Sequence, residues 1–125
     1  MEQQVSIAIV DDEEGILELM ETILGELGDL KLFSNPVDAL ADITQNQPSL
    51  LITDQHMPEL QGTDLIEKSL EVWPNLKCVV ISGDIEFTEK AEFLKENGIP
   101  LIKKPFKSVY AIRDQIEKIL STKSG

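Results

Sequence analysis

The sequence contains little cysteine: Cys78 is the only one among 125 residues. A lone cysteine excludes a framework of disulfide bonds within the chain and fits a reducing, cytoplasmic location. Cys78 lies in the apolar segment Leu76–Ile81. We therefore expect it to be a small buried residue on a strand rather than a reactive thiol.

Long apolar runs and positive charge are also scarce. No apolar stretch approaches the roughly 18–20 residues needed to cross a bilayer, and the polar start Met1-Glu2-Gln3-Gln4 does not resemble a signal peptide. The chain has 11 basic and 23 acidic side chains, which gives a net charge of −12. Because a nucleic-acid-binding surface needs positive charge, we expect neither nucleic acid nor a membrane among the partners.

Apolar residues, in contrast, make up 42% of the chain, enough for the core of one domain of this length. Short segments rich in Val, Ile and Leu are expected to be strands. They lack strict alternation, which is typical of strands buried on both faces of a sheet. The five segments are Val5–Val10, Leu30–Phe33, Leu50–Thr53, Cys78–Ile81 and Ile99–Ile102.

A stretch with helical periodicity follows each apolar segment. In the first stretch apolar residues recur from Ile16 to Leu27, and Gly28 is placed to end the helix. Because strand and helix alternate along the whole chain, we expect an α/β fold, with a parallel sheet covered by helices on both faces. The other expected helices run from Asn35-Pro36 to Ile43, over Gly62–Trp73, over Ile85–Asn97 and from Val109 to Leu120.

Polar residues suited to chemistry follow four of these strands, at the carboxyl edge where open parallel sheets bind their ligands. Taken singly, each has an ordinary structural explanation, since acids and serine cap helices and a Lys-Pro pair is common in loops. Together they bring three carboxylates, a hydroxyl and an ammonium to one edge. These residues are Asp11 and Asp12 after the first strand, Asp54 after the third, Ser82 after the fourth and Lys104 after the fifth.

Three carboxylates need a proton or a cation to lie together. Two unit charges ~4 Å apart repel by about 4 kcal/mol at an effective dielectric constant of roughly 20. Oxygen ligands of this kind suit Mg²⁺, which often shares its coordination shell with a phosphate. Lys104 could pair with Asp54 at rest and with a phosphoryl oxygen later, and Ser82 could donate a hydrogen bond to the same group.

The segments that carry these residues resemble the receiver domain of two-component response regulators. The resemblance extends from Val5 to about Leu120. It implies a flavodoxin-like receiver fold, a doubly wound (βα)5 unit whose five parallel strands have the order 2-1-3-4-5. The matching stretches are Ile9-Val10-Asp11-Asp12-Glu13, Ile52-Thr53-Asp54-Gln55-His56-Met57-Pro58 with Gly62, Val80-Ile81-Ser82-Gly83 and Lys104-Pro105-Phe106.

The resemblance also implies a phosphoacceptor regulator rather than an enzyme acting on other substrates. Asp54 would accept a phosphoryl group from the phosphohistidine of a histidine kinase or a histidine phosphotransfer protein. Ser82 and Lys104 would hold that group, and the Lys104–Pro105 peptide bond is expected to be cis.

A divalent cation is part of the same expectation. The resemblance implies that Mg²⁺, or Mn²⁺ in its place, is bound by the carboxylates of Asp12 and Asp54 and by the backbone carbonyl of His56, with Asp11 acting directly or through water. The imidazole of His56 is a poor ligand for Mg²⁺, which prefers oxygen. That side chain could instead tune the access of water to the site or lie exposed in a loop.

The sequence departs from the receiver pattern at the switch position. The aromatic residue that usually couples phosphorylation to the output surface is replaced by Leu101, three residues before Lys104. A leucine can still change its packing, but it lacks the ring, so we expect the switch to be weaker or to use another surface. Tyr110 is close in sequence, and we expect it to be a half-buried residue of the last helix rather than a replacement.

Two other functions are compatible with parts of the pattern. A pseudo-receiver that binds partners without phosphorylation would normally lack an acid of the pair, the acceptor or the lysine, and this chain has them all. A Mg²⁺-dependent phosphatase with an aspartate nucleophile needs a second carboxylate two residues later, where this chain has His56. The receiver hypothesis is therefore preferred.

The expected receiver domain occupies residues 1–121, and residues 122–125 are a tail or the start of a truncated linker. Its downstream partner would be a separate effector protein or an output domain linked to it in a longer chain.

Overall fold

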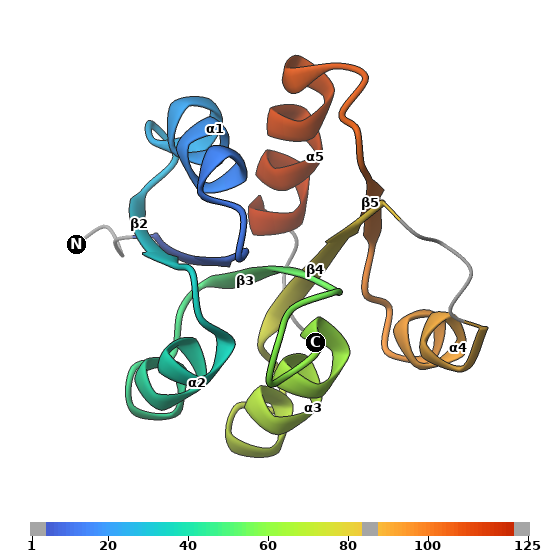
Figure 1. The fold of residues 1–125 in the computed structure, drawn as a ribbon. Coiled ribbons are helices and arrows are strands. Elements are labelled where there is room, and N and C mark those ends of the chain that lie inside the picture. The colour runs from blue at the N-terminus through green and yellow to red at the C-terminus, as the bar shows by residue number, and fades with distance from the viewer. Residues whose placement is uncertain (1–4, 84–87, 122–125) are drawn as a thin grey trace.

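The computed structural model describes residues 5–83 and 88–121. Its strands form one parallel sheet in the order β2-β1-β3-β4-β5, as the resemblance implied. Helices lie on both faces of the sheet (Figure 1), so the expected doubly wound fold is confirmed. The strands are β1 (Ser6–Val10), β2 (Asp29–Phe33), β3 (Leu50–Asp54), β4 (Lys77–Ser82) and β5 (Leu101–Lys103).

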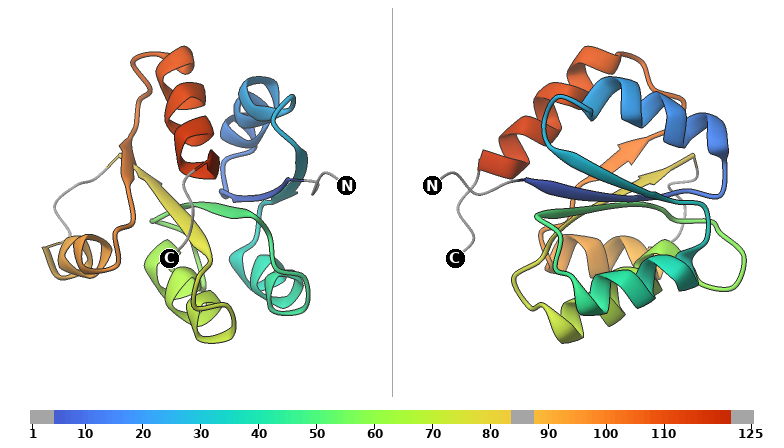
Figure 2. Two further views of the ribbon diagram at one scale, coloured as in Figure 1. Left: turned by 180° about the vertical axis from the view of Figure 1, so that it is seen from behind. Right: turned by 90° about the vertical axis from the view of Figure 1, so that its left-hand side faces the viewer.

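The helices divide into two layers. Figure 2 shows one layer above and one below the sheet, and the buried side chains divide in the same way. Met20 and Ile116 belong to the core cluster on one face, and Ile43, Leu65 and Leu94 to the cluster on the other. The first layer contains α1 (Glu14–Leu24) and α5 (Val109–Ser121); the second contains α2 (Pro36–Gln45), α3 (Gly62–Val72) and α4 (Thr88–Glu96).

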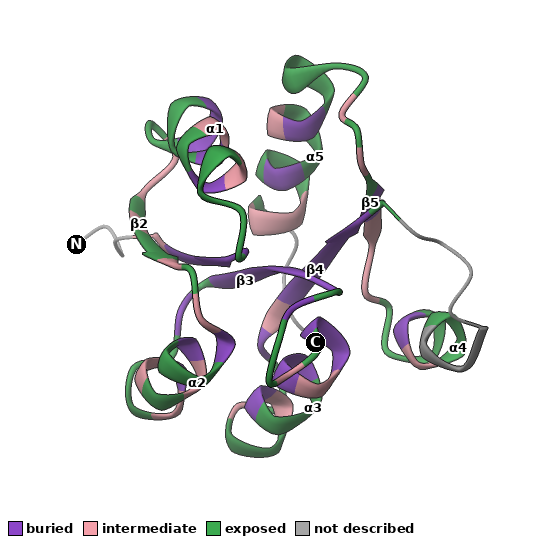
Figure 3. Ribbon diagram, viewed as in Figure 1, coloured by how far each residue is buried: buried purple, intermediate pink, exposed green. Residues whose placement is uncertain are grey.

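The central strands are buried and the edge strands are not (Figure 3). Every residue of β3 is buried, and β1 and β4 are buried at all positions after the first. β2 has no buried residue, and Ile102 is the only one in β5. The expectation that all the strands are buried on both faces is therefore wrong for β2 and β5, because an edge strand has a neighbour on one side alone.

The first helix ends earlier than its periodicity predicts. α1 stops at Leu24, and residues 25–27 form a turn in which the Leu27 N–H donates to the Leu24 carbonyl at 2.9 Å. The prediction that Gly28 ends the helix is wrong, because this glycine serves a close approach instead. A side chain at Gly28 would overlap the backbone carbonyl of Val5, so glycine lets the chain pass the start of β1.

The last strand begins at Leu101 rather than at Ile99 because the preceding residues complete α4. The Ile99 N–H donates to the Leu94 carbonyl at 2.8 Å, and Gly98 has a φ of 64°, in the left-handed region that favours glycine. The predicted start of this helix at Ile85 lies outside the described residues.

Tyr110 lies on α5, as predicted, but it is not half-buried. It is 79% exposed, whereas Ile112 and Ile116 are the buried residues of this helix. A residue two positions before Ile112 lies about 200° around the helix from it, because successive residues are about 100° apart. Tyr110 is thus on the outward face, and the expectation of partial burial is wrong.

Some expectations concern the chain as a whole. Cys78 is buried, as predicted. Across residues 5–83 and 88–121, no helix has the length and apolar character that crossing a membrane requires. The expected tail at 122–125 lies outside the described residues, so the domain boundary at residue 121 stays a prediction.

Candidate functional site

Strand register brings the polar residues to the same edge of the sheet. Val10 of β1 is the partner of Thr53 of β3, so the residues that follow them, Asp11 and Asp54, lie level with each other. One strand further, the fourth strand ends at Ser82, whose partner on β5 is the residue before Lys104. The carboxyl ends of four strands therefore meet where the sequence predicted a site.

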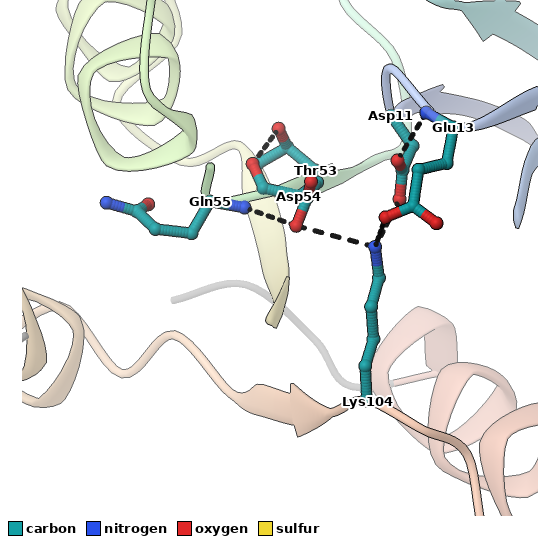
Figure 4. A network of polar contacts seen from close by, with 6 residues as sticks. All are labelled: Asp11, Glu13, Thr53, Asp54, Gln55 and Lys104. Carbon is teal, nitrogen blue, oxygen red and sulfur yellow. Dashed lines mark hydrogen bonds and ion pairs between the residues drawn. The ribbon is translucent and has the colours of Figure 1, made fainter. Parts of the chain in front are cut away.

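Lys104 reaches in between the carboxylates (Figure 4). Its Nζ lies 3.0 Å from Oδ2 of Asp11, 3.5 Å from Oε1 of Glu13 and 3.6 Å from Oδ1 of Asp54. The pairing of Lys104 with Asp54 is confirmed, although Asp11 is the nearer carboxylate. The Lys104–Pro105 peptide bond is cis, as expected.

Asp54 is the last residue of β3 and is 5% exposed. Its Oδ1 accepts a hydrogen bond of 2.9 Å from the backbone N–H of Gln55, and the same oxygen faces Lys104. Burial and then the charge of Asp11 raise the pKa of Asp54 to about 6, although Lys104 acts in the opposite direction. The folded chain therefore holds this carboxylate in place and also makes its charge unfavourable without a further cation.

Asp11 is fully buried and is held at both oxygens. Oδ1 accepts from the backbone N–H of Glu13 at 2.9 Å, and Oδ2 accepts from Lys104 at 3.0 Å. Burial raises the pKa of Asp11 overall, against the lowering effect of these two hydrogen bonds. For Lys104, burial alone would lower the pKa, but the hydrogen bond to Asp11 and the neighbouring carboxylates raise it overall, so the ammonium stays charged.

The predicted acidic ligands do come together. Asp11, Asp12 and Asp54 each offer one carboxylate oxygen, and these oxygens lie within 4.8 Å of one another. Asp12 is exposed while the other two are buried, so the cluster is reached from solvent. The donors are all oxygen and carry more negative charge than Lys104 balances, which fits Mg²⁺ or Mn²⁺. The ring of His56 is exposed, and the role of its backbone carbonyl stays a prediction.

Ser82 and Leu101 lie at the positions expected of them. Ser82 ends β4, is fully buried, and its backbone carbonyl accepts from the Lys104 N–H at 2.9 Å. Leu101 begins β5, where its strand partner is Val80, and packs half-buried against the core cluster under α2, α3 and α4. The predicted switch position therefore packs against the apolar core next to the site.

The sequence did not reveal that Gln55 ties α3 to the site. Its side chain is 1% exposed; Oε1 accepts from the Thr63 N–H at 2.9 Å, and Nε2 donates to the Thr63 hydroxyl at 3.1 Å. Gly62, the residue before Thr63, has no room for a side chain because a Cβ would overlap the Asp54 carbonyl. The available signal was the position of Gln55 directly after Asp54.

Glu13 is a second residue whose contact was not predicted. The run Asp11-Asp12-Glu13 was interpreted as an acidic pair, yet its third member reaches Lys104. Glu13 also borders a groove of about 580 Å³ between α1 and the start of α5. Apolar side chains line much of this groove, namely Ile16, Leu19, Phe106 and Val109.

Known proteins with similar sequences include response regulators. The sequence pattern of the response regulator receiver domain matches residues 7–117. The chain is 31% identical over 107 residues to response regulator protein TmoT of Ectopseudomonas mendocina, covering 85% of this chain and 49% of that protein. It is 26% identical over 123 residues to sporulation initiation phosphotransferase F of Bacillus subtilis strain 168, covering 95% and 96% of the two proteins.

A receiver domain of known structure has a similar fold. A CheY-like response regulator receiver domain protein from Methanospirillum hungatei JF-1 superposes with a TM-score of 0.86 at 27% identity, over 94% of both chains. This chain belongs to the response regulator receiver domain family. It spans about half the length of the first curated relatives that it matches.

Proposed function

We propose that this receiver domain is the phosphoacceptor switch of a two-component phosphorelay, with Asp54 as the residue that is phosphorylated. The observation that carries the proposal is the placement of Asp54 between a cation and a candidate cation site. Its carboxylate lies 3.6 Å from the ammonium of Lys104, and its oxygen lies within 4.8 Å of those of Asp11 and Asp12.

The donor in this proposal is a phosphohistidine of a histidine kinase or a histidine phosphotransfer protein. A carboxylate oxygen of Asp54 forms a bond to phosphorus while the phosphorus–nitrogen bond breaks, and its electron pair stays on the imidazole nitrogen. The products are an acyl phosphate on Asp54 and a free histidine. The domain thus catalyses only its own phosphorylation and dephosphorylation.

The chain's own residues orient and stabilise the transferred group. The N–H of Gln55 fixes one oxygen of Asp54, and Lys104 is a positive charge within reach of the oxygens that gain negative charge. Ser82, buried at the adjacent strand end, is proposed to donate a hydrogen bond to the same group. These fixed groups replace water around the reacting atoms.

The proposed cofactor is Mg²⁺, with Mn²⁺ as a substitute. Asp11, Asp12 and Asp54 would hold it, together with the backbone carbonyl of His56. When bound, the ion neutralises the clustered carboxylates and the charge on the transferred group. The excess of negative charge over Lys104 supports this assignment, since burial and like charge already raise the pKa of Asp54.

The groove beside Lys104 supports a protein as the donor. Its apolar side chains, among them Ile16 and Phe106, lie next to the acids and could be covered by a partner whose histidine reaches Asp54. Downstream, the partner is a separate effector or a linked output domain; the match covers 96% of the Bacillus subtilis phosphotransferase but 49% of TmoT. A cytoplasmic location is part of the proposal, because the one thiol needs no oxidising compartment.

The proposal is tested with acetyl phosphate and Mg²⁺, followed by intact-mass spectrometry. The wild-type protein should gain the mass of one phosphoryl group, and Asp54→Asn should gain none, because the amide cannot act as the nucleophile. Asp38→Asn, which removes an exposed acid on α2, is the matched control and should behave as the wild type. Uptake by Asp54→Asn at the wild-type rate would show that another residue is the acceptor.

A further inference from the structure

Three carboxylates lie near the ammonium of Lys104, although Asp54 alone would carry the phosphoryl group. Its closest partners are Asp11 at 3.0 Å and Glu13 at 3.5 Å, and both come from the chain at the end of β1. Asp54, where the phosphoryl group would be attached, is the farthest of the three at 3.6 Å. Figure 4 shows the ammonium on the side of Asp11 and Glu13. The resting contacts therefore draw Lys104 toward β1.

Glu13 differs from Asp11 in having no other evident role for its side chain. It is the N-cap residue of α1, but its side chain makes no capping hydrogen bond. The backbone N–H of Glu13, rather than its carboxylate, holds Asp11. The contact with Lys104 is the one polar contact described for the side chain of Glu13. Because this side chain is 65% exposed at the rim of the site, its substitution opens no cavity.

We propose that Glu13 is a positioning residue for Lys104: it holds the ammonium on the β1 side and thereby competes with the phosphoryl group on Asp54 for it. The inference rests on the proposed function, in which Lys104 must pair with the oxygens of the transferred group. Glu13 then sets how readily the domain is phosphorylated. Its own carboxylate neither binds the phosphoryl group nor takes part in bond making.

The competition has a definite direction. When acetyl phosphate is the donor, a bond forms between Asp54 and phosphorus, and the phosphorus–oxygen bond to acetate breaks with its electron pair leaving on acetate. Lys104 must turn from Glu13 to the new phosphoryl oxygens as this happens. Removing Glu13 makes that turn less costly, so phosphorylation and the binding of a phosphoryl mimic should both become more favourable. The effect of one partly exposed ion pair is about two- to fivefold.

The test compares Glu13→Gln with Glu14→Gln. Both substitutions remove one negative charge near the start of α1, but the described structure contains no contact between Glu14 and Lys104. The probe is beryllium trifluoride with Mg²⁺, and its half-saturation concentration is measured by NMR at constant ionic strength. Glu13→Gln should lower this concentration about two- to fivefold, while Glu14→Gln should leave it within experimental error of the wild type. An equal effect of both variants, or none of Glu13→Gln, overturns the proposal.

Glu13→Asp separates position from charge. It keeps the negative charge but is shorter, and an aspartate at an N-cap accepts a hydrogen bond from its own helix. Its carboxylate should therefore leave Lys104, and the variant should bind beryllium trifluoride like Glu13→Gln. If Glu13→Asp instead behaves like the wild type, charge near the site is the cause, and the positioning role is wrong.

A second readout distinguishes failure of this inference from failure of the proposed function. The side-chain ammonium resonance of Lys104 is recorded in the protein without metal or phosphoryl mimic. Glu13→Gln should shift it, and Glu14→Gln should not; an unchanged resonance in Glu13→Gln overturns the positioning role. If the resonance does shift but the wild-type protein binds no beryllium trifluoride in Mg²⁺, the phosphoacceptor function is overturned instead.

Discussion

Asp54 is a carboxylate that folding makes harder to ionise. Its pKa is raised from 3.8 to about 6, first by burial and then by the charge of Asp11. The folded protein therefore binds a proton at Asp54 more tightly than the unfolded chain does. The stability that this proton contributes is fully present below about pH 4 and is lost as the pH rises to about 6. Above that range the ionised side chain destabilises the metal-free fold.

Asp54→Asn should consequently be more stable than the wild type at pH 7 when divalent cations are absent. The expected gain is about 3 kcal/mol, because the pKa of Asp54 rises from 3.8 to about 6 and each tenfold change in proton affinity corresponds to about 1.4 kcal/mol. The gain should shrink as the pH approaches 4. Urea unfolding followed by Trp73 fluorescence measures it, since the Trp73 indole N–H donates to the Ile43 carbonyl at 2.7 Å in the folded state.

If the wild type and Asp54→Asn are equally stable at pH 7, the ionised side chain of Asp54 does not destabilise the folded protein. Asp38→Asn, at an exposed position on α2, controls for the loss of one negative charge from an acidic protein. Because Asp38 lies in the first turn of α2, its substitution should cost about 0.3–1 kcal/mol at pH 7 and should give no gain in stability.

At the scale of elements, the start of α3 depends on Gly62. The Gly62 N–H donates to the Gln55 carbonyl at 3.0 Å, and a Cβ at Gly62 would overlap the carbonyl oxygen of Asp54. The atoms that this Cβ would meet all belong to the backbone of Asp54 and Gln55, so they cannot turn away as a flexible side chain would. This close approach lets the loop after Asp54 return directly to the first turn of the helix.

Gly62→Ala should destabilise the fold by about 1–3 kcal/mol, the range for forcing extra volume into a packed site. Gly15→Ala is the control, because Gly15 lies in α1, a methyl group there would meet no atom within 4 Å, and alanine is favoured in helices. Gly15→Ala should be neutral or up to about 1 kcal/mol more stable. Urea midpoints measure both variants; equal midpoints for them would mean that the approach at Gly62 relaxes without cost.

The sequence predicted elements and strand ends well because these depend on local pattern. The alternation of strands and helices along the chain placed Asp54 at the end of the buried strand β3. It also placed the acids after β1 and Lys104 after β5. What it did not predict depends on contacts between distant segments. Gly28 is required because Val5, directly before β1, lies against it, and nothing in the spacing of α1 indicates that contact.

The site shows the same limit. The closeness of Asp11, Asp54 and Lys104 was predicted because register brings strand ends together. The contact of Glu13 with Lys104 depends on side-chain directions across 91 residues of sequence, which no local pattern encodes. Tyr110 was placed on the right helix but on the wrong face. Its partial burial was expected without comparing its position around α5 with those of the buried Ile112 and Ile116.

For the molecule as a whole, the net charge of −12 complicates every measurement with a cation. A compact chain with this charge repels itself, so any salt stabilises it by screening. Binding at the Asp11, Asp12 and Asp54 cluster must therefore appear as an effect of Mg²⁺ beyond that of Na⁺ at equal ionic strength.

About 10 mM Mg²⁺ should raise the melting temperature more than NaCl of the same ionic strength. If the dissociation constant is about 1 mM, mass action gives roughly 1.4 kcal/mol, or about 6 °C for a domain of this size. Asp12→Asn should lose the excess and keep the response to NaCl, because Asp12 is exposed and its substitution leaves the core intact. Equal shifts by the two salts in the wild type, or an undiminished excess in Asp12→Asn, would contradict a specific site, since screening acts on the total charge whereas coordination needs these oxygens together.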